Sequence, residues 1–226
     1  MSLQVLDITN AHANPAWREE YFMPGEYSHY QNLVAQTDAL AARLTDKYAA
    51  WLQCRAGCSG CCHHHLSVFP VEAAHLQTAI RALPDAEQDA IREQTLAVID
   101  SETRGEPVAC PLLVADKCAV YAARPLICRT QGLPLLYESV DGNPEVDCCP
   151  LNFTTAEGVA ALDEEHLVPL DRLNLALAAV NRVYCQEHGV DEQTAGDRIF
   201  MTDIIARALA DSDTARPDKQ PDPAAT

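Results

Sequence analysis

Cysteine is the residue type that most constrains this chain. Four of its ten cysteines fall within nine residues, in the segment Cys54-Arg-Ala-Gly-Cys58-Ser-Gly-Cys61-Cys62, and a second adjacent pair follows at Cys148 and Cys149. Loops this short cannot reach the Cα separations that unstrained disulfides require. Thiolates, however, are the soft ligands that zinc and the irons of iron-sulfur clusters prefer, with four of them in a tetrahedral shell. The spacing therefore predicts metal binding and argues against a disulfide scaffold.

The candidate ligands form two sets along the chain. The first set is Cys54, Cys58, Cys61 and Cys62, and the second is Cys110, Cys118 and Cys128, completed by Cys148, Cys149 or both. The side chains of adjacent cysteines point in different directions, so such a pair tends to serve two metals or two atoms of one cluster. The two sets could therefore share ligands, and spacing alone does not divide the thiols between sites.

Charge and the lack of targeting signals predict a protein of the reducing cytoplasm, where thiols stay available to metal. The N-terminus has no basic stretch, no apolar run and no small-residue cleavage site, so no secretory signal is expected. No apolar stretch is long enough for a membrane-spanning helix. A formal charge of −17, with no basic run among 16 Lys and Arg residues, argues against binding to nucleic acid.

The apolar periodicity predicts a mainly α-helical fold. Apolar residues recur at steps of three and four from Tyr27 to Leu52, without Gly or Pro, which predicts one long helix. Further helices are expected over 71–83, from Pro84 onward, over 169–188 and over 199–210. Residues 110–122 are typical of a short hairpin, and residues 126–129 are typical of one helical turn. Residues 132–152 contain several Gly and Pro residues, which predict a loop. The helices would frame a cysteine-rich region of loops and a short hairpin.

One metal-binding domain is expected over residues 1–210, with its cysteine-cluster core at 54–149. The 48% of hydrophobic residues suffice for an ordinary core without cross-links. Residues 211–226 contain three prolines, four aspartates and no large apolar side chain, which predicts a disordered tail.

These motifs resemble those of a known family, the YkgJ-type cysteine-cluster proteins with a zinc- or iron-chelating domain. The matching elements are Cys54 to Cys62, Cys110-Pro111-Leu112, the segment from Cys118 through Tyr121, Arg124 and Pro125 to Cys128-Arg129, and a closing Cys148 or Cys149. The resemblance covers about residues 54–149 and implies metal binding by about eight cysteines. Members are often labelled iron-sulfur oxidoreductases, so the resemblance implies one or two iron-sulfur clusters, with zinc as the alternative.

Arg124 and Arg129 gain a cofactor-binding interpretation from this resemblance. A four-thiolate cluster is anionic, and a nearby guanidinium stabilises it and raises its reduction potential. The alternative is that both arginines form ion pairs with carboxylates of this acidic chain.

Several weaker patterns have simpler interpretations. His63, His64 and His65 follow the cluster, but a polar turn explains them better than ligation, and Glu72-x-x-His75 lacks the second copy that di-iron bundles use. Cys185, on the apolar side of a helix, is expected to be a small buried hydrophobe.

The spacing Cys54-x3-Cys58-x2-Cys61 also matches the signature of radical S-adenosylmethionine enzymes, although the strand-helix alternation of their barrel is absent here. The leading expectation is electron transfer or metal handling with a protein partner. A structural or buffering zinc protein is the alternative, and a cluster-dependent enzyme, such as a methylase-like protein, is a further one.

Overall fold

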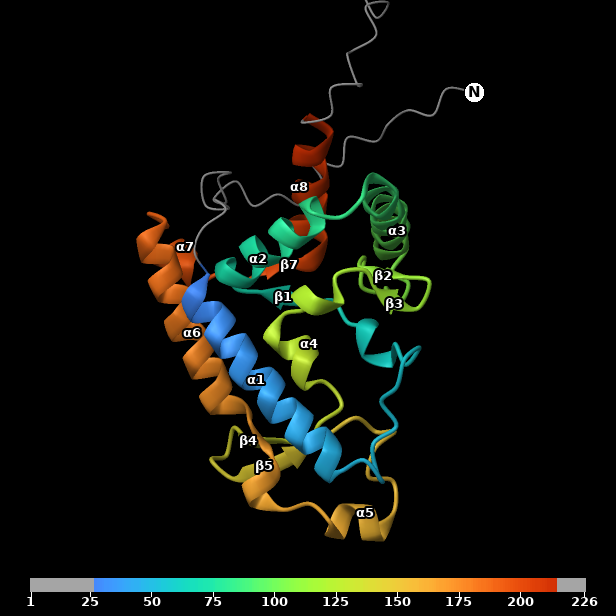
Figure 1. The fold of residues 1–226 in the computed structure, drawn as a ribbon, viewed down its shortest axis with the longest axis vertical. Coiled ribbons are helices and arrows are strands. Elements are labelled where there is room, and N and C mark those ends of the chain that lie inside the picture. Colours follow the sequence, from blue (N-terminus) through green and yellow to red (C-terminus); the bar gives the residue numbers. More distant parts are fainter. Residues whose placement is uncertain (1–26, 215–226) are drawn as a thin grey trace, which may run out of the picture.

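The computed structural model describes residues 27–214 and confirms a mainly α-helical fold (Figure 1). The helices are α1 Ser28–Lys47, α2 Pro70–Arg81, α3 Asp85–Thr103, α4 Leu126–Thr130, α5 Ala156–Ala160, α6 Leu170–Glu187, α7 Glu192–Ala195 and α8 Met201–Thr214. No helix among the described residues is long and apolar enough to cross a membrane.

Short strands join the loops to this helical frame. Strand β1 Ser67–Val68 pairs antiparallel with β7 Ile199–Phe200, and β2 Leu113–Val114 pairs antiparallel with β3 Lys117–Cys118. A three-stranded sheet places β4 Leu135–Glu138 between the antiparallel β5 Pro144–Asp147 and the parallel β6 Val168–Pro169. The strands are too short to form a core of their own, so they fix the ends of loops.

Two apolar clusters hold the helices together. The larger one contains the fully buried side chains Leu76, Ile80, Ile91, Ile204 and Ile205, from α2, α3 and α8. Burial of each such side chain contributes about 1.5–3 kcal/mol, so this cluster stabilises the fold without a cysteine ligand at its centre. The smaller cluster lies at the C-terminal end of α1 and contains Leu44, Tyr48, Leu133, Phe153 and Val168.

The long N-terminal helix is confirmed but ends earlier than predicted. It stops at Lys47, and Tyr48, Trp51 and Leu52 form a turn in which both Trp51 and Leu52 donate their N–H groups to the carbonyl of Tyr48. The Tyr48 side chain is fully buried and donates its hydroxyl to the carbonyl of His166 at 3.0 Å. Tertiary packing therefore overrides the helical periodicity of this last stretch.

The prediction of a loop over 132–152 was wrong for its middle part, which forms the β4–β5 hairpin. Leu135 packs on the smaller core cluster, and Gly142 takes a left-handed φ of 76° in the turn. Pro144 is tolerated because β5 lies at the edge of the sheet. The turn-forming residues here connect two strands of a hairpin.

The last predicted helix is shifted toward the C-terminus. Ile199 and Phe200 form β7, and α8 extends to Thr214, four residues into the segment predicted to be disordered. The rest of that segment, 215–226, lies outside the described residues, as does the N-terminal part of the predicted domain.

Candidate metal centre

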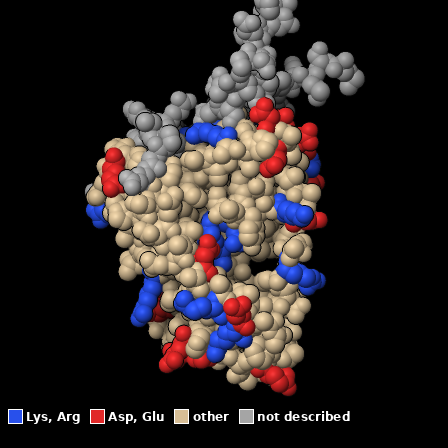
Figure 2. Space-filling model, viewed as in Figure 1, with Lys and Arg blue, Asp and Glu red and all other residues tan. Residues whose placement is uncertain are grey.

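Four separate segments carry the nine candidate cysteines. They are the loop 54–62 between α1 and β1, the β2–β3 hairpin with the residues before it, the short helix α4, and the residues that follow β5. In Figure 1 the 54–62 segment (cyan) lies on the side of the molecule away from α6, beside the β2–β3 hairpin. Figure 2 shows a hollow in this face, near the place where that segment passes α4. All ten cysteines are free thiols.

The 54–62 segment is shaped by two tight turns. Cys58 donates its N–H to the carbonyl of Arg55 at 2.9 Å, and Cys62 donates to Ser59 at 2.8 Å within the 3-10 turn Gly60–Cys62. Gly57 has a φ of 86°, which residues with a side chain rarely adopt. Cys54 and Cys58 are exposed at these turns, whereas Cys61 and Cys62 are half-buried.

Backbone hydrogen bonds bring Cys110 and Cys118 to this segment. Cys110 donates its N–H to the carbonyl of Cys62 at 2.6 Å, and Leu113, three residues on, pairs with Cys118 in the hairpin. Ala115 and Asp116 have φ values of 48° and 59°, as a tight hairpin turn requires. Burial, and after it the charges of Cys118 and Cys62, raise the pKa of Cys110 to about 11.

Helix α4 adds Cys128 to the same group. Burial raises the pKa of Cys128 to about 12, reinforced by Cys110, Cys118 and Cys62 and opposed by the positive charge of Arg124. Arg124 also lowers the pKa of Cys118, which burial raises. The Arg124 guanidinium stacks 3.6 Å from the ring centre of Tyr121, and its buried Nε atom has no hydrogen-bond partner among the described residues.

Arg129 has a different environment from Arg124. Its guanidinium donates to both carboxylate oxygens of Asp38 at 2.7 and 2.9 Å and to the carbonyls of Ala122 and Arg124. The side chain is 3% exposed, and it fastens the segment between β3 and α4 to α1. This is the ion-pair alternative raised from the sequence, and it makes Arg129 an anchor for the backbone that carries Cys128.

Glu72 is a second anchor, and sequence reasoning missed its role. Its carboxylate accepts from the N–H of Phe69 at 3.2 Å, which caps α2, and from the N–H of Leu126 at 3.0 Å, at the start of α4. Glu72 is 2% exposed, and burial raises its pKa despite these two donors. The Glu72-x-x-His75 pattern therefore belongs to the helical frame. The sequence signal for the anchoring role of Glu72 is its position as an acidic residue in the first turn of a predicted helix.

Asn152 joins Cys54 to the end of the cysteine region. Its side-chain amide donates to the sulfur of Cys54 at 3.7 Å and to the carbonyl of Gly132 at 2.7 Å, while its oxygen accepts from the N–H of Gln53 at 2.7 Å. Its own backbone N–H donates to the carbonyl of Cys149 at 2.8 Å. A Cβ atom on Gly132 would lie 2.5 Å from the Cys54 sulfur, so any larger residue at this position would force the thiol of Cys54 to move.

Cys148 and Cys149 differ in their surroundings. Cys148 packs against the smaller core cluster, and its N–H donates to Asp147 at 2.8 Å. Cys149 is near enough to Cys54 that its charge raises the pKa of Cys54, after the larger effect of burial. Both cysteines remain candidates for the position that closes the family pattern.

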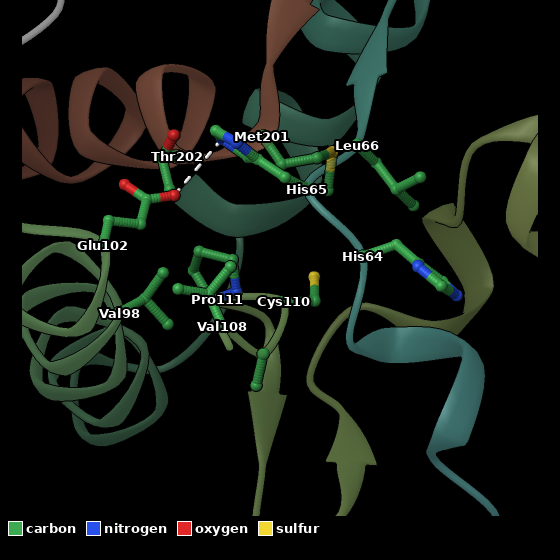
Figure 3. Close-up of a pocket in the computed structure, with 11 residues that line it drawn as sticks. His64, His65, Leu66, Val98, Glu102, Val108, Cys110, Pro111, Met201 and Thr202 are labelled. Atoms are coloured by element: carbon green, nitrogen blue, oxygen red, sulfur yellow. Dashed lines mark ion pairs between the residues drawn. The ribbon is translucent and has the colours of Figure 1, made fainter. Parts of the chain in front are cut away.

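His63, His65 and the tenth cysteine each contact a partner other than the candidate thiols. Figure 3 shows His65 directed toward Glu102, with 3.3 Å between its Nε2 and the carboxylate, in the wall of a cavity of about 10 Å³ beside Cys110. His63 bonds to the carbonyl of Ser59 at 3.0 Å. Cys185 is 1% exposed and donates to Asn181 at 3.7 Å, which confirms the expected buried position.

The chemistry of the donor set suits a soft metal, since four segments of the chain carry nine reduced thiols. Within residues 27–214, no three Cys, His, Asp or Glu side chains are already arranged to enclose a metal ion. Binding of a metal here would therefore require the thiols to move on the backbone that the hydrogen bonds above hold in place.

Comparison with known proteins supports the resemblance noted from the sequence. Residues 53–150 match the family described as "CxxCxxCC: Putative zinc- or iron-chelating domain". The matched region includes all nine candidate cysteines, and it has one residue more between Cys54 and Cys58 than the family's short name writes. Neither the curated proteins nor the solved structures compared with the chain gave a match.

Proposed function

We propose that this protein holds metal through the thiolates of its chelating domain and exchanges electrons or metal with a protein partner. One or two iron-sulfur clusters are the leading occupants, and zinc is the alternative. The observation that carries the proposal is the gathering of reduced thiols from four segments on one side of a helical frame. A cluster bound there would supply one-electron chemistry, and the chain's residues would supply ligation, charge and access.

The position of Arg124 supports the iron-sulfur occupant. Its positive charge lowers the pKa values of Cys62, Cys118 and Cys128, each of which burial raises. A guanidinium beside several thiolates offsets the negative charge of a cluster and raises its reduction potential. Tyr121 keeps the guanidinium in place by stacking on it.

The surfaces near the thiols favour a macromolecular partner over a small substrate. The cavity beside Cys110 has a volume of about 10 Å³, which is room for about one water molecule. Cys54 and Cys58, in contrast, are exposed on the outside of the domain. A protein that docks at this edge could reach the metal directly.

Purification without oxygen, followed by absorption spectroscopy and analysis of iron, sulfide and zinc, tests the proposal. We expect a brown protein with broad visible absorption and equal amounts of iron and sulfide. A colourless protein with bound zinc would select the alternative, and a protein without bound metal would overturn the proposal. Cys118→Ser should lower the metal content sharply, whereas Cys185→Ser, which changes a buried core thiol, should leave it intact.

A further inference from the structure

We propose that a basic, partly apolar surface beside the cysteines docks an acidic protein. This surface, called the basic face here, consists of the exposed side chains of Arg55, Lys117, Tyr121 and Ile127 together with Arg124, which stacks on Tyr121. The inference rests on the proposed function. It deepens that function by naming the chemistry of the partner.

The charge of the chain is unevenly divided. The segments 54–62 and 110–129 contain one acidic residue, Asp116, and four basic residues, Arg55, Lys117, Arg124 and Arg129. Their formal charge is therefore +3, in a chain whose formal charge is −17. Figure 2 shows Lys and Arg side chains on both sides of the hollow in this face of the molecule. A local field of this kind orients an approaching protein of opposite charge.

Only one of these four cations is neutralised by a carboxylate within the fold. Arg129 is 3% exposed and pairs with Asp38. Among residues 27–214, no carboxylate forms an ion pair with Arg55, Lys117 or Arg124. Arg124 lies beside the thiols and can offset the charge of a bound cluster, whereas Arg55 and Lys117 are exposed. The two exposed cations are therefore available to carboxylates of a partner.

Two large apolar side chains lie in the same segment as these cations. Tyr121 is 64% exposed and Ile127 is 41% exposed, one on each side of Arg124 along the chain. The Arg124 guanidinium lies 3.6 Å from the centre of the Tyr121 ring, so charge and aromatic surface are presented together. Tyr and Arg are enriched among the residues that dominate protein–protein binding energy. Ile127 adds an aliphatic contact, which suits a protein side chain better than a phosphate.

The basic face belongs to the backbone that carries the thiols. Lys117 pairs with Val114 in the hairpin and directly precedes Cys118, and Ile127 directly precedes Cys128. The hydrogen bond from the Cys110 N–H to the Cys62 carbonyl joins the 54–62 segment to this hairpin. A partner bound to the basic face would therefore lie next to the cysteine region, as transfer of an electron or a metal requires.

A fluorescence-anisotropy titration of the full chain tests this inference. The probe is a labelled acidic peptide, decaglutamate with one central tryptophan. We expect the wild type to bind it, and Lys117→Glu to bind it about fivefold more weakly because one exposed ion pair becomes a repulsion. Arg172→Glu is the matched control, since it changes the net charge equally at an exposed position on α6. Ile127→Ser should weaken binding of this peptide but not of plain decaglutamate.

The contrary results are equally distinct. No binding by the wild type, or an equal loss in Lys117→Glu and Arg172→Glu, would overturn the inference. Binding of a single-stranded thymidine oligonucleotide of equal charge at least as tightly as the peptide would also overturn it, in favour of nucleic acid. Should circular dichroism show that Lys117→Glu does not fold, Arg55→Glu replaces it. Metal content is measured in the same samples, so protein that binds the peptide without any metal would contradict the proposed function alone.

Discussion

At the residue scale, Gly132 offers the sharpest test of how Cys54 is placed. Its φ is 89°, and a Cβ atom would lie 2.5 Å from the Cys54 sulfur. Gly105 has a similar φ of 68°, but a Cβ atom there would have no other atom within 4 Å. Gly105→Ala is therefore a control with backbone strain and no contact. Both substitutions should cost about 1–2 kcal/mol of stability through backbone strain. Only Gly132→Ala should also lower the metal content, measured by elemental analysis, and equal metal in the two variants would contradict this placement.

Asn152 supports the same thiol by hydrogen bonding. In Asn152→Asp, a carboxylate oxygen replaces the amide that donates to the Cys54 sulfur and the Gly132 carbonyl, so two bonds are lost and like charges face each other. We expect the affinity for a metal bound by Cys54 to fall about 10- to 100-fold, as is typical when a ligand loses its supporting bond. Competition titration with a chelator measures this, and Asn143→Asp, at an exposed turn, should leave the affinity unchanged.

At the element scale, Glu72 couples α2 to α4. Glu72→Gln leaves one acceptor oxygen for two backbone donors, Phe69 and Leu126, so one buried N–H faces an amide group. The free energy of unfolding should fall by about 1–3 kcal/mol in urea denaturation. Glu87→Gln, on the exposed first turn of α3, is the control. An equal loss of unfolding free energy in both variants would contradict the coupling of α2 to α4 by Glu72.

Elements with strong periodicity were predicted well from the sequence, and elements defined by distant contacts were not. The helix after Pro84, the helix ending before Gly189 and the single turn that carries Cys128 are confirmed because a proline precedes each of them and their residues follow a local helical pattern. The β4–β5 hairpin was missed because its strands are short and depend on pairing with β6. Asn152 and Gly132 were missed as supports of Cys54 because only tertiary structure brings them to its sulfur.

At the scale of the whole molecule, the fold consists of a helical core and a cysteine-bearing region, and we expect only the second to depend on bound metal. The buried side chains of α2 and α8 pack without a candidate ligand at their centre, whereas segments 54–62 and 110–149 carry the thiols on loops and short elements. Metal removal should therefore abolish hydrogen-exchange protection in those two segments and preserve it in α2 and α8. Loss of protection throughout the chain, or in neither segment, would contradict this division.

Alkylation of the native protein tests the central claim, metal binding by these thiols, most directly. Cys54 and Cys58 are exposed in the fold, so only a bound metal can shield them from a small thiol reagent. In metal-loaded protein, mass spectrometry should find both residues unmodified, and after removal of the metal both should react rapidly. Equal reaction of Cys54 and Cys58 with and without metal would show that these thiols are not its ligands.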